Sequence, residues 1–180
     1  MSLLQEVHQC AEEHGLRFLL IGGFAVNAHG HARTTGDLDL AVPRPDRDAW
    51  QKLIQSVGHR LSESNDRFLQ FESTVRGRLP IDVMLANERT FAGLWDAAVD
   101  VEYEGRRFHV VSIEHLIAMK LHVLKQGKLH RFLKDFQDVV DLVRVNNLDL
   151  RTEKFRALFT KYGNVRLYEQ ILRFVESADR

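Results

Sequence analysis

The sequence has little of what secreted and membrane-spanning proteins depend on. Its 180 residues include one cysteine, Cys10, which has no second cysteine with which to form an internal disulfide. No apolar run approaches the ~20 residues that a transmembrane helix needs. The N-terminal segment MSLLQEVHQCAEEHG lacks the basic start and continuous apolar stretch of a signal peptide. We therefore expect a protein of the reducing cytoplasm that makes no contact with a membrane.

Net charge is also absent, because 25 basic residues balance 25 acidic ones, but the charges are unevenly distributed. Residues 1–102 contain 10 Lys/Arg and 15 Asp/Glu, whereas residues 103–180 contain 15 and 10. A basic half beside an acidic half can indicate contact with phosphate groups. Two ordinary solvated surfaces are the simpler interpretation, so charge alone does not indicate a function.

Hydrophobic periodicity predicts a protein of the α/β (α+β) class, with a small mixed sheet flanked by helices and followed by a helical extension. We expect a core over residues 1–111 and a C-terminal helical region over 112–180, which can also pack on the core as one unit. The predicted strands are 17–21, 37–42, 67–73, 79–85 and a hairpin over 99–111. The predicted helices are 3–14, 24–30, 46–57, 88–98, 113–126, 130–146, 152–161 and 165–177.

Two aspartates, Asp37 and Asp39, begin the predicted strand DLDLAV. Because side chains alternate along a strand, both carboxylates lie on one face, with Cβ atoms about 6–7 Å apart, while Leu38 and Leu40 face the core. Carboxylates this close repel each other unless a cation lies between them, and Mg²⁺ prefers such oxygen ligands. The alternatives are a solvated strand edge and ion pairs with arginines.

A third aspartate, Asp82, lies in the apolar strand LPIDVML, where a carboxylate is costly to bury without a partner. If this strand lies beside residues 37–42, three carboxylates come together. Three carboxylates can hold two metal ions roughly 3.5–4 Å apart, an arrangement suited to in-line displacement at phosphorus. The alternative for Asp82 is an ion pair with Arg76 or Arg78.

Gly22 and Gly23 stand between a predicted strand and a short helix, where backbone amides can approach a phosphate closely. Together with Arg33-Thr34-x-x-Asp37-x-Asp39 and the later Asp82, this order resembles the nucleotidyltransferases of the DNA polymerase β superfamily. The resemblance covers about residues 17–85. It implies the nucleotidyltransferase fold and the transfer of a nucleoside monophosphate from an NTP, such as ATP, to a hydroxyl group, with release of pyrophosphate.

The resemblance also implies residue roles. Asp37, Asp39 and Asp82 would be the catalytic and metal-binding residues, with two Mg²⁺ ions as cofactors and Mn²⁺ as the alternative. Asp82 would in addition orient or deprotonate the attacking hydroxyl. The nucleotide-binding set would include Gly22, Gly23, Arg33 and Thr34. The family often has serine at the position of Gly23, so here only the backbone of Gly23 is available to contact a phosphate. The alternative role for Arg33 is a salt bridge to Asp37 or Asp39.

A basic segment follows the core: from Arg106 to Lys134 there are seven Lys/Arg and one acid, Glu114. Lys120 lies in a mostly apolar helix, where its ammonium group points either toward phosphates or past the core to solvent. Met119-Lys120 in this helix, together with Arg131-x-x-Lys134-Asp135 in the next predicted helix, resembles the pattern of the abortive-infection (AbiEii-type) toxin nucleotidyltransferases. The resemblance implies that Lys120 contacts the nucleotide and that Lys134 and Asp135 support the site. The spacing of Asp135, Asp138 and Asp141 also fits a solvated helix face.

Three functional interpretations stay open. The first is transfer to RNA, such as tRNA, in a toxin-like role with an antitoxin protein as partner. The second is transfer to a small hydroxylated molecule, as in antibiotic-modifying relatives, and the third is a nucleotide- or partner-binding module without catalysis. The glycine pair and the Arg-Thr-x-x-Asp pattern are common to the first two, so the sequence does not name the acceptor.

Overall fold

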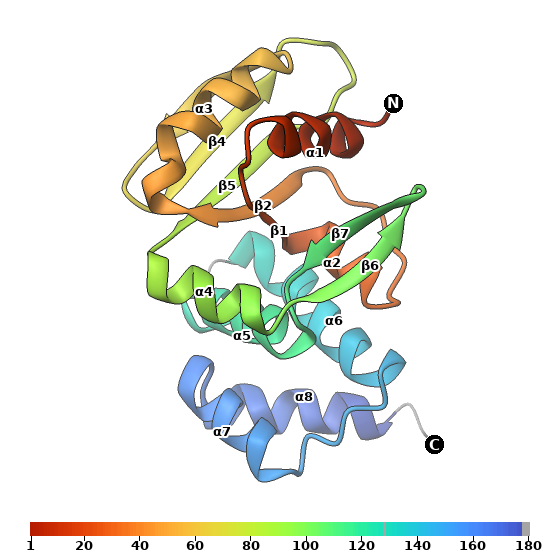
Figure 1. Cartoon of the computed structure of the whole chain (residues 1–180). Helices are drawn as coiled ribbons and strands as arrows, with labels where there is room; N and C mark the ends of the chain where they lie inside the picture. The colour runs from red at the N-terminus through yellow and green to blue at the C-terminus, as the bar shows by residue number, and fades with distance from the viewer. Residues whose placement is uncertain (128, 178–180) are drawn as a thin grey trace. The chain divides into compact units, whose positions relative to one another are not determined.

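The computed structural model describes residues 1–127 and 129–177, the side chains of 129–131 excepted (Figure 1). The chain forms two compact units. The first consists of Met1–Ala28 and Arg33–Ser112, and the second of His29–Ala32 and the chain from Ile113 onward. The expected assignment of residues 1–111 and 112–180 to separate domains stays a prediction.

The first unit is built on a mixed seven-stranded sheet with the order β3-β4-β5-β2-β1-β7-β6. Strands β2 and β5 pair in parallel, as do β1 and β7, and the other neighbours are antiparallel. The mixed sheet confirms the predicted fold class. The strands are β1 (Leu19–Leu20), β2 (Leu38–Pro43), β3 (His59–Ser64), β4 (Phe68–Ser73), β5 (Ile81–Ala86), β6 (Val99–Tyr103) and β7 (Arg106–Val110).

Four α-helices and one 3₁₀ turn accompany this sheet: α1 (Leu3–Glu13), α2 (Gly22–Ala28), η1 (Arg44–Asp46), α3 (Arg47–Ser56) and α4 (Glu88–Asp96). Local sequence fixes where two of them begin. Ser2 forms a capping box with Gln5 at the start of α1, and the Asn87 side chain accepts a hydrogen bond from the Thr90 N–H in α4. Both helices begin within one residue of the predicted positions.

Two features of the sheet differ from the prediction. Strand β3 was not predicted, because its sequence HRLSES is polar and its side chains are mostly exposed, so it lacks apolar alternation. Strand β1 has only two residues instead of the five predicted, although the Ile21 N–H still donates to the Asp39 carbonyl at 3.2 Å. Helix α2 begins at Gly22 rather than after the glycine pair.

The second unit is helical, with α5 (Ile113–Lys125), α6 (Leu129–Val145), α7 (Glu153–Tyr162) and α8 (Val165–Ser177). All four helices lie within about two residues of the predicted ranges. Their apolar faces meet in a core that includes the fully buried Leu121, Leu142, Phe159 and Ile171. Among the described residues, no helix is long and apolar enough to cross a membrane.

Candidate active site

The sheet brings two of the three aspartates side by side. Asp39 in β2 is the direct register neighbour of Asp82 in the parallel strand β5. Each is the second residue of its strand, and each stands between two fully buried apolar residues, so the two half-buried carboxylates share one face. The expectation that the strand of Asp82 lies beside the strand of Asp39 is therefore confirmed.

Asp37 completes a cluster of three carboxylates just before β2. The Thr35 hydroxyl donates a hydrogen bond to Asp37 Oδ1 at 3.0 Å. One carboxylate oxygen from each of Asp37, Asp39 and Asp82 lies within 4.8 Å of the other two, and all three residues are half-buried. Oxygens that share one octahedral Mg²⁺ lie about 3 Å apart when adjacent and about 4 Å apart when opposite. The donor set therefore fits a hard divalent cation after movements of about an ångström.

Gln70 is a site residue that the sequence analysis missed. It lies in β4 directly opposite Asp82, and its Nε2 donates to both carboxylate oxygens of Asp82 at 3.3 Å. The available signal was a polar residue between the buried Leu69 and Phe71, on a strand that pairs with β5. Arg78, one of the predicted ion-pair partners of Asp82, instead pairs with Glu6 and donates to a backbone carbonyl.

The two glycines are required by contacts within the protein. Gly22 has a φ of +58°, and a Cβ at this position would lie 1.8 Å from Asp39 Oδ2. A Cβ on Gly23 would lie 2.1 Å from the Thr35 hydroxyl oxygen. The start of α2 thus packs directly against the carboxylate of Asp39 and against the hydroxyl that holds Asp37. Sequence analysis proposed phosphate access as the reason for the glycines, and the structure adds this steric reason.

The loop before Asp37 is fixed by a second residue that the sequence analysis missed. The side chain of Asn27, in α2, accepts from the Arg33 N–H and donates to the Arg33 carbonyl, both at 2.9 Å. The Arg33 guanidinium group donates to the Thr34 carbonyl at 3.0 Å. Thr34 itself is exposed, and it is the neighbouring Thr35 that contacts Asp37. The loop is therefore held at both Arg33 and Thr35, close to the carboxylates.

In the helical unit, Lys120 is buried and paired with two aspartates. Its Nζ donates to Asp135 Oδ1 at 2.9 Å and to Asp138 Oδ2 at 2.6 Å, and each of the three residues is at most 6% exposed. The interpretations of Lys120 as reaching solvent and of Asp135 and Asp138 as part of a solvated face are therefore wrong. Lys134 is exposed, and the side chain of Arg131 lies outside the described residues.

A family model described as an uncharacterised nucleotidyltransferase matches residues 1–178. The chain belongs to this nucleotidyltransferase family. The match confirms the predicted enzyme class, nucleotidyl transfer. No curated protein matches the chain, and the resemblance to abortive-infection toxins stays a prediction.

Solved structures of other nucleotidyltransferases show the same fold. The antibiotic-resistance factor ANT(2″)-Ia, in complex with adenylyl-2″-tobramycin, is 18% identical with a TM-score of 0.64, over 98% of this chain and 97% of that chain. The lincosamide antibiotic adenylyltransferase LnuA, with lincomycin bound, is 14% identical with a TM-score of 0.60, over 79% and 95%. A putative nucleotidyltransferase from Thermotoga maritima is 17% identical with a TM-score of 0.53, over 74% and 91%.

Proposed function

We propose that this nucleotidyltransferase transfers a nucleoside monophosphate from an NTP to a hydroxyl group in a reaction that depends on divalent cations. The observation that carries the proposal is the cluster of Asp37, Asp39 and Asp82, whose ligand oxygens lie within 4.8 Å of one another on two paired strands and the preceding loop. These carboxylates would hold two Mg²⁺ ions, with Mn²⁺ as the alternative metal. When bound, such ions neutralise the negative charge that develops on the transferred phosphoryl group.

Within this proposal, Asp82 orients the acceptor hydroxyl and takes its proton. The bond that forms joins the acceptor oxygen to the α-phosphorus, and the bond that breaks joins that phosphorus to the oxygen bridging to the β-phosphate, so pyrophosphate leaves. Two hydrogen bonds from Gln70 fix the orientation of the Asp82 carboxylate, which supports such a positioning role. The backbone at Gly22 and Gly23 is proposed to bind the triphosphate.

Further nucleotide-binding roles are proposed for Arg33 and Thr34 in the loop and for Lys134 in the helical unit, whereas Lys120 and Asp135 are proposed to support the site without touching the nucleotide. The loop residues are supported by the hydrogen bonds from Asn27 that hold the Arg33 backbone. Lys120 already donates to two carboxylates, so its role is to position the helices rather than to carry a phosphate. The exposed ammonium group of Lys134 is the better phosphate ligand of the two lysines.

The acceptor we favour is a small hydroxylated molecule. Two structures with the same fold are an antibiotic-resistance factor with an adenylylated tobramycin and a lincosamide adenylyltransferase with lincomycin, and both span most of this chain. An RNA acceptor such as tRNA, with an antitoxin partner, is the second candidate. It is favoured by the exposed basic side chains of the helical unit, among them Lys125, Lys134 and Arg156.

The experiment that tests the proposal is incubation of the purified protein with each α-³²P-labelled NTP and Mg²⁺ or Mn²⁺. One set of reactions contains aminoglycosides and lincosamides, and the other contains total bacterial RNA. Label in an antibiotic supports the favoured acceptor, and label in tRNA supports the second. The Asp37→Asn/Asp39→Asn variant is the control and should transfer no label.

Substitution of Asp82 separates catalysis from binding. Asp82→Asn keeps the size of the side chain and a hydrogen-bonding partner for Gln70, but it removes a charge and a base. We expect NTP binding to survive and transfer to fall at least about 100-fold. If neither protein releases pyrophosphate with any acceptor while both bind NTP, the chain is a nucleotide-binding module and the proposed reaction is wrong.

A further inference from the structure

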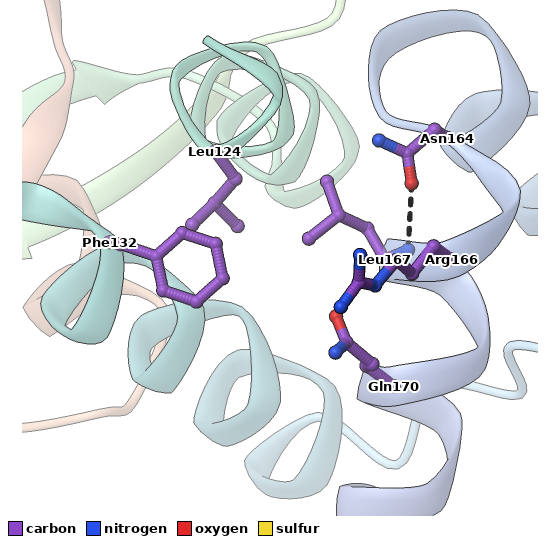
Figure 2. Close-up of a pocket in the computed structure, with 6 residues that line it drawn as sticks. All are labelled: Leu124, Phe132, Asn164, Arg166, Leu167 and Gln170. Carbon is purple, nitrogen blue, oxygen red and sulfur yellow. Dashed lines mark hydrogen bonds between the residues drawn. The ribbon is translucent and has the colours of Figure 1, made fainter. Parts of the chain in front are cut away.

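The helical unit contains a pocket that the proposed reaction does not use. It has a volume of about 260 Å³ and is lined by Leu124 of α5, Phe132 of α6, and Asn164, Arg166, Leu167 and Gln170 at the start of α8 (Figure 2). All six residues belong to the same compact unit. The described lining of the pocket therefore comes from the helical unit alone.

One side of the pocket is apolar. Leu124 and Leu167 are 3% and 5% exposed, and the half-buried ring of Phe132 lies beside Leu124 in Figure 2. An apolar cavity of about 150 Å³ lined by such side chains is large enough to bind benzene. The larger volume here therefore accommodates a six-membered ring together with a substituent of several atoms.

The other side of the pocket presents hydrogen-bond donors. The Asn164 side-chain oxygen accepts from the Leu167 N–H at 2.9 Å, which fixes the amide so that its NH₂ group is the part left for a ligand. Arg166, which is exposed, carries five further N–H donors and no acceptor. Gln170 is the one lining side chain whose amide can either donate to a ligand or accept from it.

The lining of the pocket is positively charged. Arg166 is the one charged residue among the six, and none of them is acidic. The nearest acid along α8, Glu169, is paired with Arg173. Fixed donors and a guanidinium group around an apolar floor are complementary to an anion that carries a ring.

We propose that this pocket binds a small aromatic acid, with the ring against Leu124, Phe132 and Leu167 and the anionic group at Arg166 and Asn164. The inference rests on the pocket alone and holds whether or not the proposed transfer reaction is correct. Its ligand is recognised by a carboxylate, or by another oxyanion with the same donors, and not by a hydroxyl group.

The test uses 4-fluorobenzoate as the probe and ¹⁹F NMR line broadening with the full-length protein as the readout. The neutral 4-fluorobenzamide and the cationic 4-fluorobenzylamine have nearly the same shape. We expect the benzoate to bind most tightly, the amide more weakly and the amine least. Arg166→Gln should weaken benzoate binding about fivefold, the size of one exposed ion pair, and leave the amide unchanged.

Arg173→Gln is the matched control, because Arg173 lies on the same helix but is not part of the pocket lining. It should leave the binding of all three probes unchanged. The proposal is overturned if benzoate and benzylamine bind equally, if Arg166→Gln and Arg173→Gln have the same effect, or if no probe broadens at millimolar concentration. A Leu124→Trp variant, which fills the pocket, should also release the benzoate, and retained binding there would place the probe elsewhere.

Discussion

Gly22→Ala is the substitution whose effect the structure predicts most sharply. At a φ of +58°, alanine costs about 1–2 kcal/mol of stability in any environment. In addition, the new Cβ would lie 1.8 Å from Asp39 Oδ2 and 2.6 Å from Asp39 Cβ. Rotation of the carboxylate relieves the first clash but not the second, because the Cβ of Asp39 is fixed by the backbone of β2. The strand or the start of α2 must therefore shift.

Gly15→Ala is the matched control for this experiment. Gly15 has a φ of +64°, and a Cβ at this position would meet no described atom within 4 Å, so the substitution carries the conformational cost without the clash. Overpacking typically costs about 1–3 kcal/mol. For a chain of this size, we expect Gly22→Ala to lower the melting temperature by about 2–12 °C more than Gly15→Ala does.

The second readout is the metal site itself. Because Asp39 is displaced in Gly22→Ala, Mn²⁺ binding followed by electron paramagnetic resonance should weaken, and any transfer activity should fall about 100-fold. Gly15→Ala should match the natural sequence in both assays. If the two alanine variants have equal melting temperatures and equal Mn²⁺ affinities, Gly22 does not approach Asp39 as described and the account of the glycine pair is wrong.

Three further predictions concern the charged and titratable groups, and Lys154→Met serves as the control for one of them. Asp39→Asn removes one of the three clustered carboxylates, so the melting temperature should no longer rise with added Mg²⁺. A rise as large as that of the natural sequence would contradict the proposed metal site. Lys120→Met should lower the free energy of unfolding, measured by urea denaturation, by about 3–5 kcal/mol, because it leaves two carboxylates buried without their cation. The control Lys154→Met removes a lysine from an exposed ion pair and should lower it by less than about 1 kcal/mol. Burial lowers the pKa of His8, so as the pH falls the imidazole of the unfolded chain is protonated before that of the folded protein. The free energy of unfolding should therefore decrease as the pH falls below about 6.5. His8→Phe keeps an aromatic ring against Phe108 and should make the free energy of unfolding less dependent on pH in this range.

Sequence patterns were sufficient for the parts of the site that local geometry determines. Two-residue spacing singled out Asp37 and Asp39, although β2 begins at Leu38 and Asp37 lies in the loop before it, and an isolated carboxylate in an apolar strand singled out Asp82. That β2 and β5 are direct neighbours is a property of the sheet order, which no local sequence pattern determines, and only the strand register places Asp39 opposite Asp82. The residues that orient these carboxylates were missed for the same reason, because Gln70 and Thr35 act through pairing and loop contacts.

The two groups of aspartates in the chain show why spacing alone does not assign a role. Asp135 and Asp138, three residues apart on α6, have the spacing of a solvated helix face, yet both are buried and share the ammonium group of Lys120. This buried set joins α5 to α6, and removing one partner of such a set is strongly destabilising. Asp37, just before β2, and Asp82, in β5, are half-buried instead, and they receive hydrogen bonds from the side chains of Thr35 and Gln70. Half-buried carboxylate oxygens that lie within 4.8 Å of one another suit an external cation, and this difference in burial, which is invisible in the sequence, favours Asp37, Asp39 and Asp82 as the metal-binding group.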